Sequence, residues 1–379
     1  MAFSYWEQDT FIGRPDVCII GSGIVGLNAA INLKSRSPFL KILILERGYL
    51  PAGASTRNAG FACFGSISEL LMDMQTESES DVMSLVEKRW RGLQNMRQVL
   101  GDEVLNYEAL GGYELFTSGD AIRYEMCSAK IEHFNHLLSS ITKQTHTYLN
   151  ADKNIVRFGF SGVDHMIVNT GEGQIDTGKM MEALIEKASV LGIKILNGIK
   201  VEKYIDENPK VRVIVTGNEN IYCDKLLICT NGFAPELIDE IDVEPARAQV
   251  LVTEPLENIL FRGTFHYDEG YYYFRNIGTR VLLGGGRNLA FEQEKTSTDD
   301  LNDMIQRRLE DLLGTMIVPG QNVRIARRWS GIMGLGSSKK SIVKKISPSA
   351  YCAVRLGGMG VAIGNLVAAE AADLILDDL

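Results

Sequence analysis

Residues 16–26 read Asp16-Val17-Cys18-Ile19-Ile20-Gly21-Ser22-Gly23-Ile24-Val25-Gly26, and this stretch decides the fold of the chain. The apolar residues before the first glycine predict a short buried strand, and the pattern after it predicts a helix to about Lys34. Gly21 allows a tight turn, Gly23 lets backbone amides approach a pyrophosphate, and Gly26 lets the helix pack closely on the sheet. The stretch therefore predicts a βαβ unit that binds a dinucleotide.

A carboxylate follows the next predicted strand, at the place where such a unit binds ribose. The strand is predicted at Lys41–Leu45, and Glu46 lies 20 residues beyond Gly26. A carboxylate there can accept hydrogen bonds from the hydroxyls of an adenosine ribose. The competing interpretation is a glycine turn that only packs a helix, beside a solvated glutamate. Strand, turn, helix and carboxylate in this order favour the nucleotide, but NAD and FAD satisfy the motif equally well.

Three further segments favour a flavin. Gly53–Phe61 contains small residues whose amides can bond phosphate, and its Arg57-Asn58 pair can reach a flavin ring. Gly357–Val361 lies between a predicted strand and a predicted helix, so the start of the helix would direct amides and a partial positive charge at one end of the ring system. Leu226–Gly232 is a predicted buried strand that ends in small polar residues. The predicted cofactor is therefore FAD.

These segments and their order resemble the D-amino-acid oxidase family of flavoproteins, which includes glycine oxidase, sarcosine oxidase and γ-glutamylputrescine oxidase. Further matches lie at Pro245–Pro255, at Tyr271–Arg275 before Gly284–Gly286, and at Arg328–Gly334, so the resemblance covers nearly the whole chain. It implies an α/β fold with a Rossmann-like FAD-binding domain of the GR2 type and an inserted α+β substrate domain with an antiparallel sheet.

Nucleotide-fold segments at the start, middle and end of the chain predict that both domains are discontinuous. We expect the FAD-binding domain at residues 1–105, 165–245 and 325–379, and the substrate domain at residues 106–164 and 246–324.

The resemblance also implies which residues hold FAD. The dinucleotide would run along the first turn and the end of the second strand, the loop after it would lie by the pyrophosphate and ring, and a valine would meet the adenine. Two later segments would close over the nucleotide and cover the pyrimidine edge of the ring. In that order the residues are Gly21, Gly23, Ile24, Val25, Gly26, Glu46, Arg47, Ser55, Thr56, Arg57, Asn58, Ala59, Gly60, Phe61, Val201, Thr230, Asn231, Gly232, Gly358, Met359, Gly360 and Val361. Family members with covalent flavin use a cysteine in the region matching Gly331–Ser338, which has none here, so we expect non-covalent FAD.

Two departures from the family bear on the substrate. Glycine oxidase-like members hold the substrate carboxylate with an arginine in the segment matching Trp329–Gly334 and carry another arginine in the turn matching Gly357–Val361, where this chain has Met333 and Met359. An α-amino acid would lose its bidentate guanidinium partner, which favours a small amine of the putrescine type. The basic stretch Lys339–Lys345 stands where the family has an acidic residue and a proline, and we interpret it as a solvated loop.

The chemistry that the resemblance implies is hydride transfer to the flavin from the carbon beside an unprotonated amine, giving an imine, with O₂ or an electron carrier as reoxidant. Tyr271, Tyr273 and Arg275 alternate along a predicted strand and are expected to share one face, where they would contact substrate, and Met333 is expected to line the pocket. The alternative for the tyrosines is core packing. The alternative function is a flavin-bearing module of a larger redox or RNA-modifying system, without turnover of free small amines.

Composition limits the partners. The 379 residues include 39 basic and 48 acidic side chains, and the net charge of −9 argues against nucleic acid or an anionic membrane as the main partner. The chain begins without a signal-peptide pattern, so we expect a cytoplasmic protein. The six cysteines form no Cys-x-x-Cys pair and are expected to be reduced, and the five histidines predict no metal site.

Overall fold

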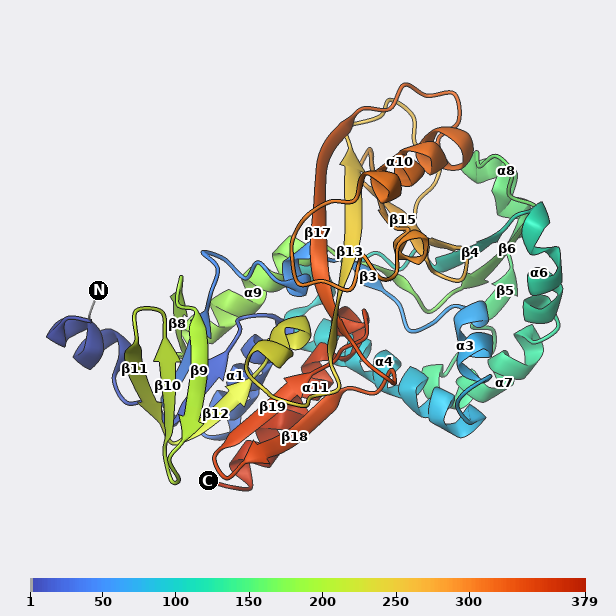
Figure 1. The fold of residues 1–379 in the computed structure, drawn as a ribbon. Helices are drawn as coiled ribbons and strands as arrows, with labels where there is room; N and C mark the ends of the chain where they lie inside the picture. Colours follow the sequence, from blue (N-terminus) through green and yellow to red (C-terminus); the bar gives the residue numbers. More distant parts are fainter. Residues whose placement is uncertain (1–2) are drawn as a thin grey trace. The chain divides into compact units, whose positions relative to one another are not determined.

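A six-stranded sheet is built around the strand predicted near the start of the chain. In the computed structural model, which describes residues 3–379, β1 (Val17–Ile20) pairs in parallel with β2 (Ile42–Glu46) and with β12 (Lys225–Ile228). Every residue of β1 is buried, as expected for a parallel strand covered on both faces. The full order is β18-β19-β12-β1-β2-β8, in which β8 is Lys194–Asn197, β18 is Ile342–Ser347 and β19 is Ala350–Val354 (Figure 1).

Two layers cover this sheet. On one face, α1 (Ile24–Arg36) packs against α11 (Gly360–Leu376) and α9 (Thr177–Val190). On the other face, Cys18 and Ile20 share a core with a three-stranded sheet made of β9 (Val201–Asp206), β10 (Val211–Val215) and β11 (Glu219–Cys223). The predicted Rossmann-like arrangement is therefore present.

A second sheet contains eight strands in the order β17-β13-β16-β15-β14-β4-β6-β5. Its pairs between β13 and β5 are antiparallel except for the parallel pair β14–β4. The predicted sheet-rich substrate region is thus a mixed, mainly antiparallel sheet. Its strands are β4 (Gly112–Phe116), β5 (Tyr148–Asn150), β6 (His165–Asn169), β13 (Glu244–Thr253), β14 (Thr264–Tyr267), β15 (Tyr272–Ile277), β16 (Arg280–Gly285) and β17 (Ile325–Leu335).

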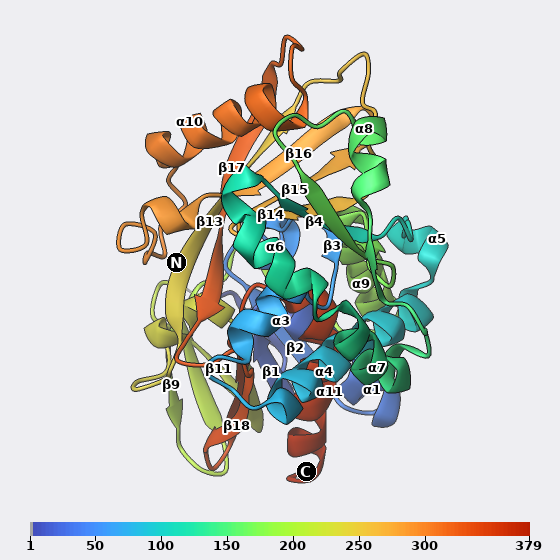
Figure 2. The same ribbon diagram turned by 90° about the vertical axis from the view of Figure 1, so that its right-hand side faces the viewer.

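The two faces of the eight-stranded sheet differ in character. Phe265, Phe274 and Leu283 lie on one face and pack with Leu309 of α10 (Asp303–Leu312), so that face forms an apolar core. Figure 2 shows α10 and the strands of this sheet as ribbons. The opposite face carries residues one position along each strand, because successive side chains of a strand alternate between faces. Polar and titratable side chains gather there.

The long helix α4 (Glu79–Leu100) is capped at its start by Ser78, whose side chain accepts a hydrogen bond from the Asp81 amide. It also buries Arg89, which is 2% exposed, so it is more than a surface helix. The remaining helices after residue 50 are α2 (Ala54–Arg57), α3 (Ile67–Asp73), α5 (Asp102–Leu105), α6 (Ala121–Ser128), α7 (Ile131–Thr142) and α8 (Ile155–Phe158), and the short strands β3 (Phe61–Ala62) and β7 (Gly173–Gln174) pair with each other.

The interpretation of Lys339–Lys345 as a loop is wrong for its second half. Ile342–Ser347 forms the edge strand β18, in which Lys344 and Lys345 are exposed and Lys345 pairs with Asp378. Lysine is common on edge strands because a charged side chain discourages pairing with another chain.

The chain divides into two compact units. The first unit runs to Arg57 and adds Thr177–Ala246 and Ile332–Leu379, and the second comprises Asn58–Asp176 and Arg247–Gly331. The boundaries that the sequence analysis places at residues 105/106 and 164/165 differ from these divisions. Within the second unit, α4 packs against α7 and α3 packs against α6, which accounts for the placement of residues 58–105 there.

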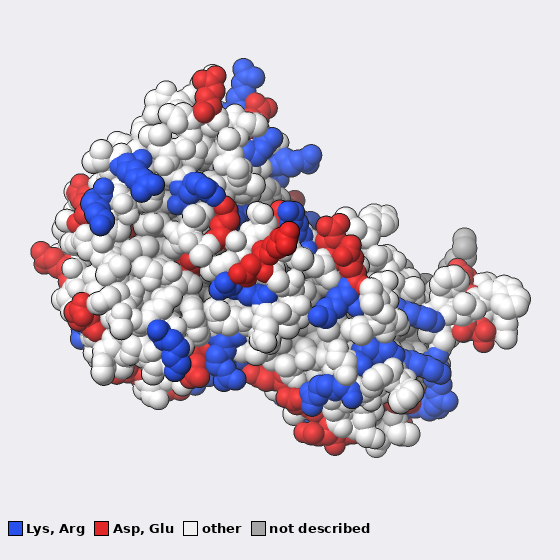
Figure 3. Space-filling view, turned by 180° about the vertical axis from the view of Figure 1, so that it is seen from behind, with Lys and Arg blue, Asp and Glu red and all other residues white. Residues whose placement is uncertain are grey.

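Acidic and basic side chains are interspersed on the face that Figure 3 shows. Within residues 3–379, no helix combines the length and the apolar character that crossing a bilayer requires. The same residues hold no group of three or more His, Cys, Asp or Glu side chains that is placed to bind a metal ion.

Candidate functional site

The glycine turn between β1 and α1 has the geometry that a dinucleotide requires. Gly21 has a φ of +100°, and a Cβ on it would lie 3.0 Å from the Cys229 carbonyl oxygen. A Cβ on Gly26 would overlap the Gly21 carbonyl oxygen, so only glycine lets α1 approach the strand this closely. Ile24 and Val25 begin the helix and are buried.

Glu46 is held at the end of β2 by hydrogen bonds that orient its carboxylate. The Ser22 amide and hydroxyl donate to Oε2 at 3.0 and 2.8 Å, and the Gly48 amide donates to Oε1 at 2.9 Å. Ser22 is fully buried, and sequence reasoning missed its role because it considered only the glycines of the motif. A carboxylate fixed in this way has lone pairs available for ribose hydroxyls, so the residues present fit the adenosine half of FAD.

The segment around α2 is brought to the same turn. Ser55 Oγ accepts a hydrogen bond from the Ile24 amide at 2.9 Å, and a Cβ on Gly23 would lie 2.8 Å from this oxygen. The bare backbone at Gly23 therefore leaves room for an oxygen atom at the beginning of α1. A phosphate oxygen is suited to such a position, because the first amides of a helix carry a partial positive charge.

The other predicted contacts of the first unit lie as follows. The Arg47 guanidinium lies 3.7 Å from the centroid of the Phe233 ring, and Val201 is buried in the core between the two sheets. Thr56 donates to the Pro51 carbonyl oxygen, and Arg57 ends α2.

Two distant segments meet around Asn231 and Met333. Asn231 Oδ1 accepts hydrogen bonds from the Arg355 and Leu356 amides at 3.1 and 3.2 Å. A Cβ on Gly232 would overlap the Met333 carbonyl oxygen, and a Cβ on Gly358 would lie 3.5 Å from Met333 Sδ.

The turn Gly357–Met359 places the start of α11 beside Asn231 and Met333. Gly358 has a φ of +80°, Met359 precedes α11, Gly360 begins it, and Val361 is buried. Thr230 Oγ1 is buried and has no hydrogen-bond partner within residues 3–379. The structure thus brings together the Thr230–Gly232 and Gly358–Val361 segments that the sequence analysis singled out.

In the second unit, the Asn58–Phe61 segment lies against β15. Asn58 Oδ1 accepts a hydrogen bond from the Gly60 amide at 2.8 Å, and Ala59 and Gly60 are buried. A Cβ on Gly60 would lie 3.0 Å from Arg275 Nη2. The Phe61 ring meets the Tyr273 ring edge to face, with 5.8 Å between centroids.

Arg275 is a buried charged group on this face of the sheet. It is 6% exposed, and its Nε has no hydrogen-bond partner among the residues that the structure describes. Burial lowers the pKa of Arg275 to about 10, although Asp176 and Glu108 act in the opposite direction. The group is charged at neutral pH. Beside it, burial raises the pKa of Tyr273 to about 12, so the phenol is neutral.

His266 is a member of the same face that sequence reasoning missed. It is the cross-strand partner of Tyr273, and its ring meets Phe61 edge to face at 5.2 Å. Its Nε2 is buried and has no partner in the described part of the chain. Burial lowers the pKa of His266 to about 4, so the imidazole is neutral and one ring nitrogen is an acceptor.

The expectation that Tyr271 shares this face is wrong. The strand begins at Tyr272, and the Tyr271 amide donates to the Asp268 carbonyl oxygen in the turn before it. The Tyr271 ring packs against Phe291 and the apolar core of the opposite face. Alternation therefore holds for Tyr273 and Arg275 but not for a residue outside the strand.

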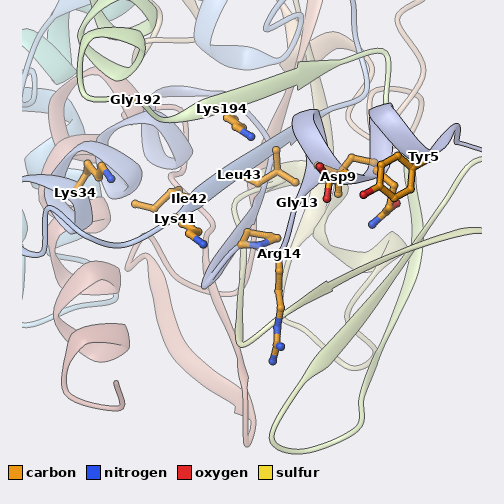
Figure 4. A pocket seen from close by; sticks show the side chains of 13 residues that line it. Tyr5, Asp9, Gly13, Arg14, Lys34, Lys41, Ile42, Leu43, Gly192 and Lys194 are labelled. Atoms are coloured by element: carbon orange, nitrogen blue, oxygen red, sulfur yellow. The ribbon is translucent and has the colours of Figure 1, made fainter.

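A cavity of about 540 Å³ in the first unit lies away from these residues (Figure 4). It is lined by Lys41 and Ile42 at the start of β2 and by Lys194 at the start of β8. Ligands of parallel sheets bind at the carboxyl ends of the strands, which is the opposite edge. Lys194 Nζ also donates to the Thr10 carbonyl oxygen, so this cation is already engaged.

Comparison with known proteins agrees with this geometry. A probable oxidoreductase OrdL of Rhizobium meliloti is 25% identical over 98% of this chain and 88% of its own length. The γ-glutamylputrescine oxidoreductase of Escherichia coli is 22% identical over 96% of this chain and 84% of its own length. Among solved structures, glycine oxidase from Geobacillus kaustophilus superposes with a TM-score of 0.76 at 16% identity, covering 96% of this chain and 95% of that one. This last likeness shows the fold.

A family model described as FAD dependent oxidoreductase (DAO) matches residues 16–374. The match confirms the resemblance seen in the motifs, including FAD as cofactor. Because it spans nearly the entire sequence, this protein belongs to the DAO family of FAD-dependent oxidoreductases.

Proposed function

We propose that this protein oxidises the C–N bond of a small amine or amino-acid derivative to an imine, with non-covalently bound FAD as the hydride acceptor. The similarity to γ-glutamylputrescine oxidoreductase and to the sarcosine oxidase β subunit of Rhizobium meliloti, which is 22% identical over 90% of this chain, supports an amine as donor. The observation that carries the proposal is the pair of buried, unpartnered nitrogen atoms on one sheet face, Arg275 Nε and His266 Nε2.

The residues of the first unit would hold the cofactor. Glu46, oriented by Ser22, would accept hydrogen bonds from the ribose hydroxyls, and the bare backbone at Gly23 would face the pyrophosphate. The segments Thr230–Gly232 and Gly358–Val361 provide further backbone groups. No cysteine lies in Gly331–Ser338, so acid precipitation should release the yellow colour into the supernatant as free FAD.

The polar sheet face of the second unit would hold the substrate. Arg275 supplies a buried positive charge whose Nε has no hydrogen-bond partner among the described residues, so an anionic group on the substrate can replace the solvation that the guanidinium loses on burial. Neutral His266 can accept a hydrogen bond from the substrate nitrogen, and Phe61 and Tyr273 exclude water from its apolar part.

This arrangement changes the substrate preference that the sequence suggests. Met333 and Met359 favour an amine without a carboxylate, whereas buried Arg275 offers the guanidinium that those positions lack. We therefore assign the preference to amines that carry a carboxylate, within the same reaction class.

Anaerobic bleaching of the bound flavin tests this assignment. Matched pairs of an N-alkyl amine and its α-carboxylated counterpart should differ by tenfold or more in favour of the carboxylated member, which is about 1.4 kcal/mol of transition-state preference. Equal or reversed rates would remove Arg275 from substrate binding. If neither amines nor amino acids bleach the flavin under argon, the proposed reaction is wrong.

A further inference from the structure

In the second unit, the backbone N–H and C=O groups of two consecutive residues, Phe64 and Gly65, bond to buried side chains. Glu172 Oε1 accepts the amides of Phe64 and Gly65 at 2.9 and 3.0 Å. Arg89 Nη1 donates to the Phe64 carbonyl oxygen at 3.1 Å, and Tyr148 Oη donates to the Gly65 carbonyl oxygen at 2.6 Å. We call Glu172, Arg89 and Tyr148 the clamp.

Glu172 is the centre of the clamp. It is 1% exposed, and its Oε1 also accepts a hydrogen bond from Asn169 Nδ2 at 3.2 Å. Its other oxygen occupies the space beside Gly112, where a Cβ would overlap it, so the glycine at 112 makes room for this carboxylate. Burial raises the pKa of Glu172 to about 8, although the Gly65 and Phe64 amides favour the ionised form. Keeping a carboxyl group here therefore costs stability.

The same segment of chain holds the residues before Phe64. The Ile175 amide donates to the Gly60 carbonyl oxygen at 2.9 Å, and β7 pairs with β3 so that Phe61 lies opposite Gln174. Residues 172–175 thus fix residues 60–65 along their whole length. What they fix is the position of Gly60 against Arg275 and of Phe61 against His266 and Tyr273.

A loop that only connects two elements does not need the hydrogen bonds that the clamp makes to Phe64 and Gly65. The β3–β7 pair already ties the two segments together, and an exposed loop satisfies its remaining peptide groups with water. Here the three ionisable side chains of the clamp, together with Asn169, which also donates to the Gly65 carbonyl oxygen at 3.2 Å, bond to the backbone of two residues instead. Buried polar side chains that all bond to one segment are characteristic of a segment whose position matters for a functional site.

We propose that Glu172 is a positioning residue that sets the Asn58–Gly65 segment for binding FAD and substrate. This inference rests on the proposed function, because it takes Asn58–Phe61 to be the loop beside the flavin ring. Glu172 itself touches neither ligand; it acts through Phe64 and Gly65.

The experiment compares Glu172→Ala with Glu172→Gln in the full chain. Hydrogen exchange of peptides covering residues 58–68 is measured without FAD, and FAD affinity and the visible circular dichroism of bound FAD are measured by titration. We expect Glu172→Ala to speed exchange of the Phe64 and Gly65 amides at least tenfold, to weaken FAD at least tenfold and to change the visible dichroism. Glu172→Gln keeps the oxygen that accepts these bonds, so its FAD affinity should stay within threefold of the wild type.

Leu309→Ala is the matched control for general destabilisation. Leu309 is fully buried on α10, on the opposite face of the sheet, so this variant should unfold more easily yet bind FAD within threefold of the wild type. If Glu172→Ala speeds exchange but leaves FAD affinity and dichroism unchanged, the clamp is structural only and the inference is overturned. If Leu309→Ala weakens FAD as much as Glu172→Ala does, it is overturned as well.

Tyr148→Phe tests the same positioning role if Glu172→Ala does not fold. It removes one hydrogen bond to the Gly65 carbonyl oxygen and keeps the buried ring, so FAD should weaken at least threefold, and unchanged affinity overturns the inference. Failure of the proposed function has a different result. In that case the wild type binds FAD, the clamp variants bind it less tightly, and no amine or amino acid bleaches the flavin.

Discussion

The glycine turn of the first unit and the polar sheet face of the second unit satisfy their polar groups in different ways. In the turn, both oxygens of Glu46 accept hydrogen bonds from nearby residues of the same unit, and Ser55 caps the free amide of Ile24. On the sheet face, Arg275 Nε and His266 Nε2 are buried without a partner in the described residues. The turn is complete by itself, whereas the sheet face offers donors and acceptors for which a ligand is the natural partner.

This difference separates two kinds of contribution to function. The polar groups of the turn are already hydrogen-bonded, so its function depends on backbone geometry. FAD binding should therefore be lost entirely when an added side chain blocks the close approach of two backbone segments. A face with unpaired charge should keep its fold and lose selectivity when one side chain is removed. The four predictions below test this contrast, from the largest expected effect to the smallest.

Gly26→Ala should abolish FAD binding. The added Cβ overlaps the carbonyl oxygen of Gly21, and neither backbone segment can yield without moving α1 from the sheet. The measurement is flavin absorbance after desalting. Gly314→Ala is the control, because a Cβ there meets no atom within 4 Å, and this variant should keep its flavin. A yellow Gly26→Ala protein would show that the turn tolerates displacement.

Arg275→Met should remove the preference for carboxylated donors and leave FAD bound. The loss of one partner of a buried charge pair costs about 2–5 kcal/mol, so kcat/KM for the preferred carboxylated donor should fall by thirtyfold or more. The uncarboxylated member of the pair should change little. Arg280→Met is the control on the next strand, where the guanidinium donates to the Thr253 carbonyl oxygen. Equal losses for both donors would assign Arg275 a structural role.

Glu46→Ala should weaken FAD without destroying the turn. The carboxylate is replaced at the end of β2, so the ribose loses hydrogen bonds to a charged group, which are worth about 1.5–3 kcal/mol. Titration of the apoprotein measures this loss, and Glu46→Gln should show a smaller one because an acceptor oxygen remains. Unchanged affinity in both variants would mean that the carboxylate serves only Ser22 and Gly48.

His266→Asn should flatten the dependence of stability on pH. Burial lowers the pKa of His266 from 6.5 to about 4, so between these values the unfolded state binds more protons than the native state. The free energy of unfolding therefore rises with pH across this window, and the stability gained there disappears as the pH falls back through it. The contribution is about 1–3 kcal/mol. Urea unfolding at several pH values measures it, and an unaltered slope in the variant would show that other groups dominate.

The same contrast explains how much of the structure can be predicted from the sequence. The turn, its helix and Glu46 lie within about 30 residues, so local spacing identifies them. The sheet face unites positions on separate strands, and no local pattern links Phe61 to His266. The strand that places His266, Thr264–Tyr267, has only four residues and was not predicted.

The burial of charged side chains was the property least predictable from the sequence. Arg275 was predicted as a contact residue, but its burial depends on segments that are far away in the chain. Glu172 lies between Gly171 and Gly173 and has the appearance of a solvated turn residue. Only the fold reveals that it is buried and accepts two amides of a distant segment.

The division of each unit among separate stretches of chain has a consequence for biosynthesis. The strand β1 and helix α1 leave the ribosome first, but their neighbours β12, β19 and α11 are made much later. Until the last helix, Gly360–Leu376, has been synthesised, the apolar faces of the nascent first unit lack their final cover. The cofactor-binding unit can therefore be completed only after α11 has been made, and nascent chains should depend on chaperones that shield apolar surface during translation.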